Sequence, residues 1–596
     1  MKLKVIKDPI ELDLMAVRLK NTQAFSFDTE TTGLDPWKAE TFMLSFSDGE
    51  TAWVVPKRYF TPKLLSSVLT DIFAEPKKEV IGHNLKFDLH FLKNTFGVTC
   101  YRQLHDTCLQ GFLLDENRPN GLKPLAREIL NYKTSEEDLV KKWLEANFSK
   151  KEDYRYDSVP EEITAPYSGS DAWLTFKLHE ALQPRIKEHF LDLYNNERQV
   201  LGILYKMEQN GLKVDVPYLQ ELALTYELKA TEQMKAVWKI AGEEFDVNSN
   251  DQLSRILFTK LGIPCPIFTA KGNQSTAEEA LNLIDHPIVE ALKKYRETAH
   301  DLSTSIKSPL ELVDKNGYLH SDYSINRAKT GRFSCSRPNN QNVKKDPAIK
   351  RAYIVEPDEE AWLFDQSQIE MVGFAQYSKD VKMLKALENN VDLHAMTAAT
   401  VYEKPIENVT KQERAIGKGT NFAIVYGCGD RKLASFINNY MTEGRISDQE
   451  AAIFKNRYKA KFPAVTSFTQ RVIYAVKQNR APWGHFVRNQ FGRVRRLDPI
   501  NKAYTGVNHL IQGWAADLMK HGMVRLEKSL GPLWRQNIHD AIRIDHSKQW
   551  NTPEQKKEWL MEVSKCLTDF PEVEPNIKVT IETFNTNWAD AVEVKL

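Results

Sequence analysis

One stretch, from Arg414 to Gly427, constrains the fold of this chain more than any other. Charged and aromatic residues recur in it every four positions, as Arg414, Lys418, Phe422 and Tyr426. In an α-helix of about 3.6 residues per turn these side chains follow one stripe, with two cations at one end and two rings at the other. Arg and Lys can neutralise a triphosphate, and a ring can stack on a sugar or base. The stripe predicts a nucleotide-binding helix, although an amphipathic helix with a wet basic edge would have the same spacing.

The length and the charge distribution indicate several domains and local phosphate-binding surfaces. A chain of 596 residues is too long for one hydrophobic core and predicts about three to five structural units. The net charge of +1 gives no overall sign of a nucleic-acid partner. However, Ser324–Arg351 contains eight Lys or Arg and one acid, and Arg471–Arg496 contains seven and no acid. Such tracts bind phosphate chains even in neutral proteins, and solvated surfaces are the alternative interpretation.

Cysteine usage and hydropathy predict a location inside the cell. The six cysteines are scattered, without a C-x-x-C pair or a zinc-like His cluster, so we expect reduced, structural thiols. The N-terminus lacks the apolar core of a signal peptide, and no stretch is long and apolar enough to cross a bilayer. We therefore expect a cytoplasmic protein, or one in the host cytoplasm if it is viral, with no membrane partner.

Acidic residues form three motifs in the first 190 residues. Asp28 and Glu30 end an alternating apolar run, so they point to the same face of a predicted strand. Adjacent carboxylates repel unless a cation lies between them, which favours a metal site over a strand that simply exposes its acids. Asp88 follows at a predicted strand-to-helix junction, and Tyr167 and Asp171 lie one helical turn apart.

Two further acids lie at predicted strand ends in the second half. Asp365 ends a short apolar run and is followed by Glu370. Much later in the chain, Asp540 lies in an alternating segment that is typical of a hairpin strand.

These motifs, in this order, resemble those of family A DNA polymerases, and those of the first 190 residues resemble DEDD-type 3′-5′ exonucleases. The resemblance covers nearly the whole chain, and the 414–427 stripe resembles the family's nucleotide-binding fingers helix. It implies an α/β fold, with an RNase H-like 3′-5′ exonuclease domain followed by a right-hand polymerase domain of palm, fingers and thumb. The implied bounds are 1–190 for the exonuclease and 191–596 for the polymerase, with the thumb at about 191–325, the palm at about 326–385 and 498–596, and the fingers at about 386–497.

For the exonuclease, the resemblance implies two divalent cations, Mg²⁺ or Mn²⁺, and active proofreading. Oxygen ligands without Cys or His fit that choice of metal. Tyr167 would orient the attacking water, and Leu34, Asn84 and Phe87 would position the terminal nucleotide. The implied metal ligands are Asp28, Glu30, Asp88 and Asp171.

For the polymerase, the resemblance implies that Asp365 and Asp540 meet on adjacent strands and hold two Mg²⁺ ions. Lys418 is a candidate proton donor to pyrophosphate, and Glu370 would exclude a ribose 2′-hydroxyl. The side chains implied to bind the dNTP are Arg414, Lys418, Phe422, Tyr426, Glu370, Gln368 and His394. Those implied to contact primer-template DNA are Arg332, Asn339, Gln341, Asn342, Asn508, Gln512 and His539.

The chain departs from the family pattern at Gln366, Met371, Val372, Tyr504 and Ala541. Ala541 replaces the usual Glu of a His-Asp-Glu motif, which puts an ancillary carboxylate in doubt. These departures leave open an exonuclease whose polymerase half is a degenerate DNA-binding module.

A single-subunit RNA polymerase is the other alternative, and Glu370 argues against it because its bulk should block a 2′-hydroxyl. Only 27 residues precede Asp28, which leaves no room for a 5′ nuclease domain and favours a phage-type replicase or a trimmed repair enzyme. We expect a monomer that acts in DNA replication, and the sequence is silent on replisome or processivity partners.

Overall fold

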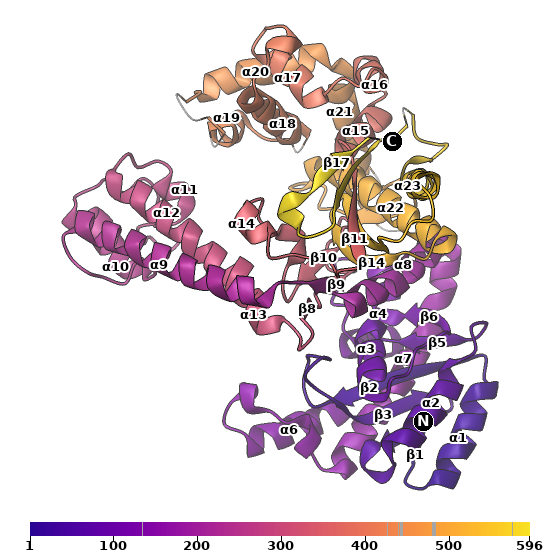
Figure 1. Cartoon of the computed structure of the whole chain (residues 1–596). Helices are drawn as coiled ribbons and strands as arrows, with labels where there is room; N and C mark the ends of the chain where they lie inside the picture. Colours follow the sequence, from indigo (N-terminus) through magenta and orange to yellow (C-terminus); the bar gives the residue numbers. More distant parts are fainter. Residues whose placement is uncertain are drawn as a thin grey trace.

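A computed structural model of the chain describes residues 1–596 except 134, 426, 439, 442–444, 479–483, 575 and 596. Residues 1–190 form one part of the molecule, and the remaining residues form a second part with a projecting arm and a separate lobe (Figure 1). None of the helices in the described ranges is both long and apolar enough to traverse a lipid bilayer.

A six-stranded mixed sheet forms the centre of the first part, in the order β1-β4-β3-β2-β5-β6. Alternation along β2 separates its two faces: Phe25 and Phe27 pack edge-on against Phe73 of α2, whereas Ser26 on the other face donates a hydrogen bond to the Ala172 carbonyl of α7. The face that carries Asp28 is therefore covered by α7. The strands are β1 Lys2–Val5, β2 Ala24–Thr31, β3 Thr41–Ser47, β4 Thr51–Pro56, β5 Glu79–Gly82 and β6 Gln103–Asp106; the helices are α1 Pro9–Asn21, α2 Pro62–Phe73, α3 Leu85–Phe96, α4 Thr107–Leu114, α5 Leu122–Leu130, α6 Ser135–Asn147 and α7 Glu161–His189.

A five-stranded antiparallel sheet, in the order β14-β15-β11-β16-β17, forms the centre of the second part. On its central strand, Trp362 and Phe364 are buried in a cluster that includes side chains of α22 and α23, and Asp365 lies on the opposite face. The elements are β11 Glu359–Gln366, α15 Ile369–Ser378, α22 Gly506–Ser529, β14 Leu533–Ile538, β15 Ala541–Ser547, α23 Pro553–Thr568, β16 Val579–Phe584 and β17 Val592–Val594.

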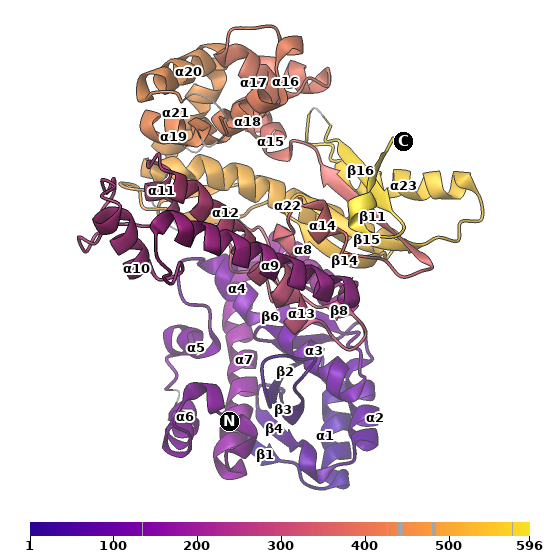
Figure 2. The ribbon, with the colours of Figure 1, turned by 60° about the vertical axis from the view of Figure 1, so that its left-hand side comes forward.

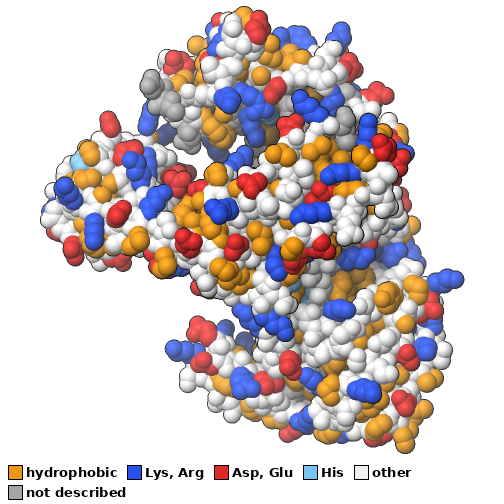
Figure 3. Space-filling view, in the orientation of Figure 1, with side chains coloured by type: hydrophobic (Ala, Val, Ile, Leu, Met, Phe, Trp, Pro, Cys, Tyr) orange, Lys and Arg blue, Asp and Glu red, His pale blue; other side chains and the backbone are white. Residues whose placement is uncertain are grey.

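An arm and a lobe extend from this sheet, and the surface between them is hollowed, with Lys and Arg side chains on the lobe beside the hollow (Figure 3). Such a basic hollow suits a polyanion. The arm consists of α9 Val216–Ala241, α10 Asn250–Ser254, α11 Glu278–Leu281, α12 Pro287–Asp301 and α13 Ser308–Leu312. The lobe consists of α16 Val381–Glu388, α17 Leu393–Val401, α18 Lys411–Val425, α19 Asp430–Asn438, α20 Asp448–Lys461 and α21 Pro463–Gln478, and the hairpin β12 Phe486–Arg488 and β13 Val494–Arg496 leads back to the sheet.

Helix α8, Leu191–Asn210, joins the two parts through two buried glutamates. Glu197 accepts a hydrogen bond from Lys520 of α22 at 2.8 Å and pairs with Arg493. Glu208 pairs with Lys86 of α3 and lies 2.6 Å from His90 Nε2. One helix is therefore bonded to both parts.

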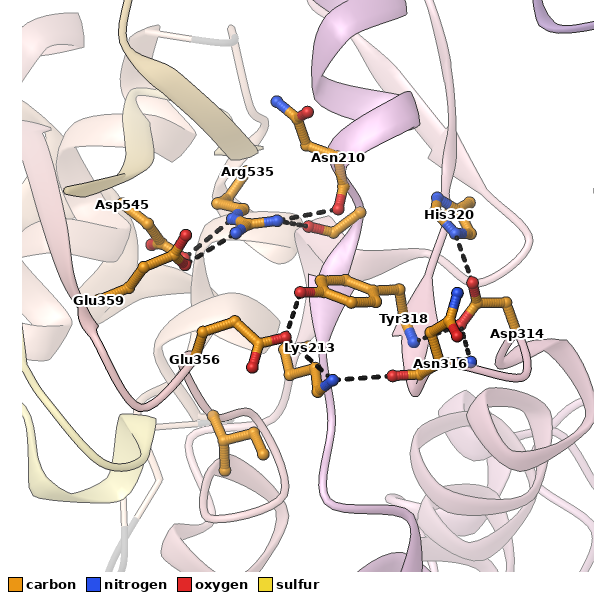
Figure 4. Close-up of polar contacts among 12 residues, drawn as sticks. Asn210, Lys213, Asp314, Asn316, Tyr318, His320, Glu356, Glu359, Arg535 and Asp545 are labelled. Atoms are coloured by element: carbon orange, nitrogen blue, oxygen red, sulfur yellow. Dashed lines mark hydrogen bonds and ion pairs between the residues drawn. The ribbon is translucent and has the colours of Figure 1, made fainter. Parts of the chain in front are cut away.

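Polar contacts continue beyond the end of α8, around the short pairing of β7, Leu212–Lys213, with β8, Tyr318–Leu319 (Figure 4). Arg535 of β14 donates to the Asn210 carbonyl at 2.9 Å and to carboxylates at both ends of its guanidinium, those of Glu359 and Asp545. The start of the arm is thus fixed to the five-stranded sheet.

Candidate active sites

The first candidate site lies at the edge of the five-stranded sheet, where β11 ends and the β14-β15 hairpin turns. The register places Asp365 opposite Ala541, and the Gln366 amide donates to the Asp540 carbonyl at 2.9 Å. His539 has a φ of 56°, a left-handed conformation that allows a tight turn between the two strands. Asp365 is therefore on β11, and Asp540 lies in the turn directly before the adjacent strand β15.

Charged side chains from several elements shift the pKa values of these two aspartates. Burial raises the pKa of Asp540 to about 6; Arg332 and Lys418 act against this rise, and Glu370 and Asp365 add to it. Burial and Glu582 raise the pKa of Asp365, and Lys418 opposes them. A cation bound here would favour the ionised carboxylates.

Arg332 lies between two acids of this site. Its guanidinium pairs with Glu370 and is 3.6 Å from an oxygen of Asp540. The turn before it needs Gly331, whose φ is 86° and at which a Cβ atom would clash with the side chain of Arg493. The structure thus places Arg332 beside Asp540; its predicted contact with DNA is untested.

The predicted nucleotide-binding stretch forms helix α18. Arg414 and Lys418 are exposed, and Lys418 Nζ lies 6.0 Å from the centre of the Phe422 ring. Arg414 donates through Nε to Asp392 at 2.5 Å. The stripe therefore exists as predicted up to Phe422, and Tyr426 lies outside the described residues.

Two other predicted nucleotide ligands make contacts within the protein. His394 is 4 % exposed, its Nδ1 is 3.0 Å from Asn421 Nδ2, and burial lowers its pKa to about 4. Gln368, which has a φ of 52°, accepts a hydrogen bond from the Leu393 amide at 3.1 Å. Both side chains connect α17 to its neighbours in this structure, so their roles toward a nucleotide stay predictions.

The predicted DNA-contacting residues differ in their exposure. Asn339, Asn342 and His539 are exposed, whereas Gln341 is 6 % exposed and donates to the Asn537 side chain at 3.1 Å. Gln341 is thus placed to support the β14 strand. The half-buried Asn508 and Gln512 lie on one face of α22, and the buried Oδ1 of Asn508 has no hydrogen-bond donor among the described residues. An unsatisfied buried oxygen is consistent with a ligand contact.

The second candidate site lies between β2, α3 and α7. Asp28 and Glu30 are on the face of β2 that α7 covers, and α7 carries both Tyr167 and Asp171. Asp88, in the first turn of α3, accepts hydrogen bonds from the Thr29 amide at 2.9 Å and hydroxyl at 2.7 Å. The predicted strand and helix positions of these residues are therefore confirmed, while their roles stay predictions.

Burial and mutual repulsion shift the carboxyl groups of this second site. Burial raises the pKa of Asp28 to about 7, and burial together with Asp28 raises that of Glu30 to about 8. The pKa of Asp88 is also raised well above its ordinary value, by burial first and then by Asp28. Acids in such an environment favour a bound cation.

Lys123 is a member of this site that our sequence analysis missed. It lies on α5, which packs beside α7 (Figure 2), and it is 7 % exposed. Its ammonium pairs with Asp171 and lies 4.8 Å from the centre of the Tyr167 ring. Its position in the first turn of a helix, where a cation opposes the helix dipole, was the available signal.

A cavity of 760 Å³ adjoins this second site and lies between the two parts of the molecule. Its lining includes Leu34, Asn84 and Phe87, the three residues predicted to position a terminal nucleotide, and Ser324 and Arg337 from the second part. Residues of both parts therefore line this cavity.

The donor sets of both sites fit a hard divalent cation. Each combines carboxylates with raised pKa values, and the side chains that we expect to bind the metal are all Asp or Glu. Within the described residues, no three His, Cys, Asp or Glu side chains are gathered as a ready-made metal site. At the second site, the ammonium of Lys123 takes the place next to Asp171.

Comparison with known families and proteins gives a consistent result. The family model described as "DNA polymerase family A" matches residues 216–590, and one described as "3'-5' exonuclease" matches residues 3–187. A solved structure described as the POL domain of Pol1 from M. smegmatis, in complex with DNA primer-template and dNTP, superimposes with a TM-score of 0.82 at 22% identity. The match covers 98% of this chain and 99% of that one.

Similar curated proteins are bacterial. The chain is 30% identical to "DNA polymerase I" of Pseudomonas aeruginosa, over 91% of this chain and 61% of that protein. It is 31% identical to "DNA polymerase I, thermostable" of Thermus thermophilus, over 66% of this chain and 49% of that protein. The chain spans about three fifths of the length of the Pseudomonas relative.

Proposed function

The chain belongs to DNA polymerase family A, and from this premise we propose that it extends a primer 3′ end with deoxynucleotides and trims mispaired ends by 3′-5′ hydrolysis. Its fold class is the expected one, an exonuclease domain followed by a polymerase domain. The observation that carries the proposal is that Asp365, near the end of β11, lies beside the β14-β15 turn that holds Asp540, with Lys418 acting electrostatically on both.

For synthesis, Asp365 and Asp540 would hold two Mg²⁺ ions, which activate the primer hydroxyl and neutralise the triphosphate when they are bound. Lys418 and Arg414 project from one side of α18, where they can neutralise phosphates and hold them in line with the primer end. Lys418 can also supply a proton to the leaving pyrophosphate. Phe422, one turn further on, is placed to lie against the deoxyribose.

Selection of the sugar and of the base pair would depend on two paired residues. Arg332 is paired with Glu370 and lies 3.6 Å from Asp540, so both side chains would lie near a primer terminus that met the metal ligands. Glu370 excludes a 2′-hydroxyl by its bulk, and Arg332 can donate to the minor-groove acceptors that every correct pair presents.

For proofreading, Asp28, Glu30, Asp88 and Asp171 would hold Mg²⁺ or Mn²⁺, which activate water and stabilise the departing 3′ oxygen when bound. The phenol of Tyr167 can orient that water, because burial raises the pKa of Tyr167 well above its ordinary value and keeps it protonated as a hydrogen-bond donor.

The expected role in phage-type replication stays a prediction, as does the monomeric state. The relatives described above are named DNA polymerase I and come from bacteria. Synthesis measured on a long single-stranded template, at enzyme concentrations that permit one binding event per template, would separate a replicase from a gap-filling enzyme.

One assay tests the main proposal. A labelled primer-template is incubated with Mg²⁺ and the wild-type chain, with and without dNTPs. We expect extension with dNTPs and shortening without them. Shortening under both conditions would favour the alternative of an exonuclease with a degenerate polymerase half, which Ala541, in the place of an acid, keeps under consideration.

A further inference from the structure

A buried lysine among carboxylates is unusual enough to need a reason. Lys123 is 7 % exposed, although α5 begins on the surface with Gly121 and a lysine in a first helical turn normally points to water. Burying an ammonium is costly unless carboxylates offset the lost hydration. At Lys123 the offset comes from the acids of the exonuclease site: Asp171 is bonded to it directly, and Asp28 and Glu30 lie within its electrostatic field.

The ammonium of Lys123 and a divalent cation would both bind the same carboxylate oxygens. An ammonium is a compact point charge with three donors, and Mg²⁺ or Mn²⁺ binds the same carboxylate lone pairs. Asp171 is one of the four predicted metal ligands, so an oxygen that accepts from Lys123 is less available to a metal. Both cations also relieve the same repulsion between Asp28 and Glu30.

We propose that Lys123 is an internal counter-ion of the exonuclease site, which holds the acids together in the metal-free protein and which a divalent cation must displace from Asp171 in order to bind. Lys123 is thus a positioning residue that sets the metal affinity of this site. The inference rests on the proposed exonuclease function, because it takes Asp171 as a metal ligand.

Two further acids act on the ammonium of Lys123. They are Glu136 and Glu137, in the first turn of α6. We expect the ammonium, on its flexible four-carbon stem, to turn toward these acids when a metal occupies Asp171. The Tyr167 ring, 4.8 Å from Nζ, would lose this neighbour as the metal binds, so the proposed water-orienting side chain would respond to metal loading.

The test is calorimetric titration of Mn²⁺ into metal-free protein. An Asp365→Ala, Asp540→Ala parent removes the polymerase ligands, so that the heat reports the exonuclease site. We expect Lys123→Met to bind Mn²⁺ on the order of tenfold more tightly than the parent, because the competitor is gone. Lys123→Arg should stay close to the parent. Lys86→Met is the matched control: Lys86 is a buried lysine of the same domain, paired with Glu208, and its loss should leave the Mn²⁺ affinity unchanged.

A purely structural lysine predicts the opposite sign, since a disordered site binds metal more weakly. An unchanged or weaker Mn²⁺ affinity of Lys123→Met would overturn the proposal. If this variant does not fold, Lys123→Gln gives the same comparison with a polar neutral side chain. In EDTA, the variant should melt at a lower temperature than the parent, because it lacks the ammonium of Lys123. Addition of Mn²⁺ should raise the melting temperature of the variant by more than that of the parent. Equal melting temperatures in EDTA would also count against the proposal. Degradation of a primer by the wild type tests the exonuclease function separately.

Discussion

Both candidate sites combine carboxylates with Lys or Arg side chains, but the two sites take these side chains from differently arranged parts of the chain. The acids of the exonuclease site, and the cation Lys123 among them, come from residues 28 to 171 of one domain and are held by the packing of α5 and α7 around β2. The polymerase site has its acids at a sheet edge, and the cations that act on Asp540 come from two separate places, the turn at Arg332 and helix α18. The first site therefore draws its charged side chains from packed elements of one domain, whereas the second draws its cations from two elements outside the sheet.

Removal of Asp540 should separate the two sites most strongly. We expect Asp540→Ala to reduce primer extension by roughly 10³-fold, because one of two shared metal ligands is lost, and to leave degradation without dNTPs nearly unchanged. Rates of both reactions on the same labelled substrate are the measurement. Extension at wild-type rates would show that the sheet edge is not the synthetic site.

Removal of an acid from the exonuclease site should have a smaller effect on degradation than loss of Asp540 has on extension. Asp28→Ala is expected to lower degradation by about 10²-fold while extension persists, since three of the four predicted metal ligands remain. The measurement is shortening of a primer with a mismatched 3′ end. If both activities fall together, the domains are coupled more tightly than the comparison implies.

Substitution of Glu370 tests whether the Glu370–Arg332 pair contributes to sugar selection at the polymerase site. Glu370→Ala should raise incorporation of ribonucleotides relative to deoxynucleotides by at least about tenfold, because the bulk that meets a 2′-hydroxyl is removed. Competitive single-nucleotide insertion gives the ratio. A ratio equal to that of the wild type would remove Glu370 from sugar selection and leave it as the partner of Arg332.

The pH dependence of stability gives the smallest effect. Burial raises the pKa of Asp28 from 3.8 to about 7, so its protonated form favours folding below pH 4, and this contribution is lost as the pH rises through 7. In EDTA, Asp28→Asn should therefore raise the melting temperature at pH 8 by roughly 3 °C and change it little at pH 5. A larger gain at pH 5 than at pH 8 would contradict the assigned direction.

Much of this arrangement was predictable from local patterns. Alternation located Asp28 and Asp365 on strands, four-residue spacing located Lys418 and Phe422 on one helix, and the resemblance to a family supplied the pairing of distant motifs. These features depend on residues that are close in sequence or on an order of motifs.

The features that were not predicted depend on contacts between distant segments. Gln341 is buried against Asn537, almost two hundred residues later, a contact that no local pattern indicated; its expected contact with DNA stays a prediction. Lys123 enters the exonuclease site because α5 packs on α7, and its position in the first turn of a helix is a weak signal by itself. Burial of His394 likewise depends on Asn421 from another helix.

The contacts of helix α8 have a consequence for the proposed removal of a mispaired primer end. Glu197 is bonded into the polymerase domain and Glu208 into the exonuclease domain, so α8 links the two domains through buried polar contacts. Under the proposed function, transfer of a primer end between the two sites would then require movement of the nucleic acid. A frayed end would then reach the cavity beside Leu34 more often than a well-paired one, and the melting of the last base pairs, more than any swing of the protein, would set the rate of editing.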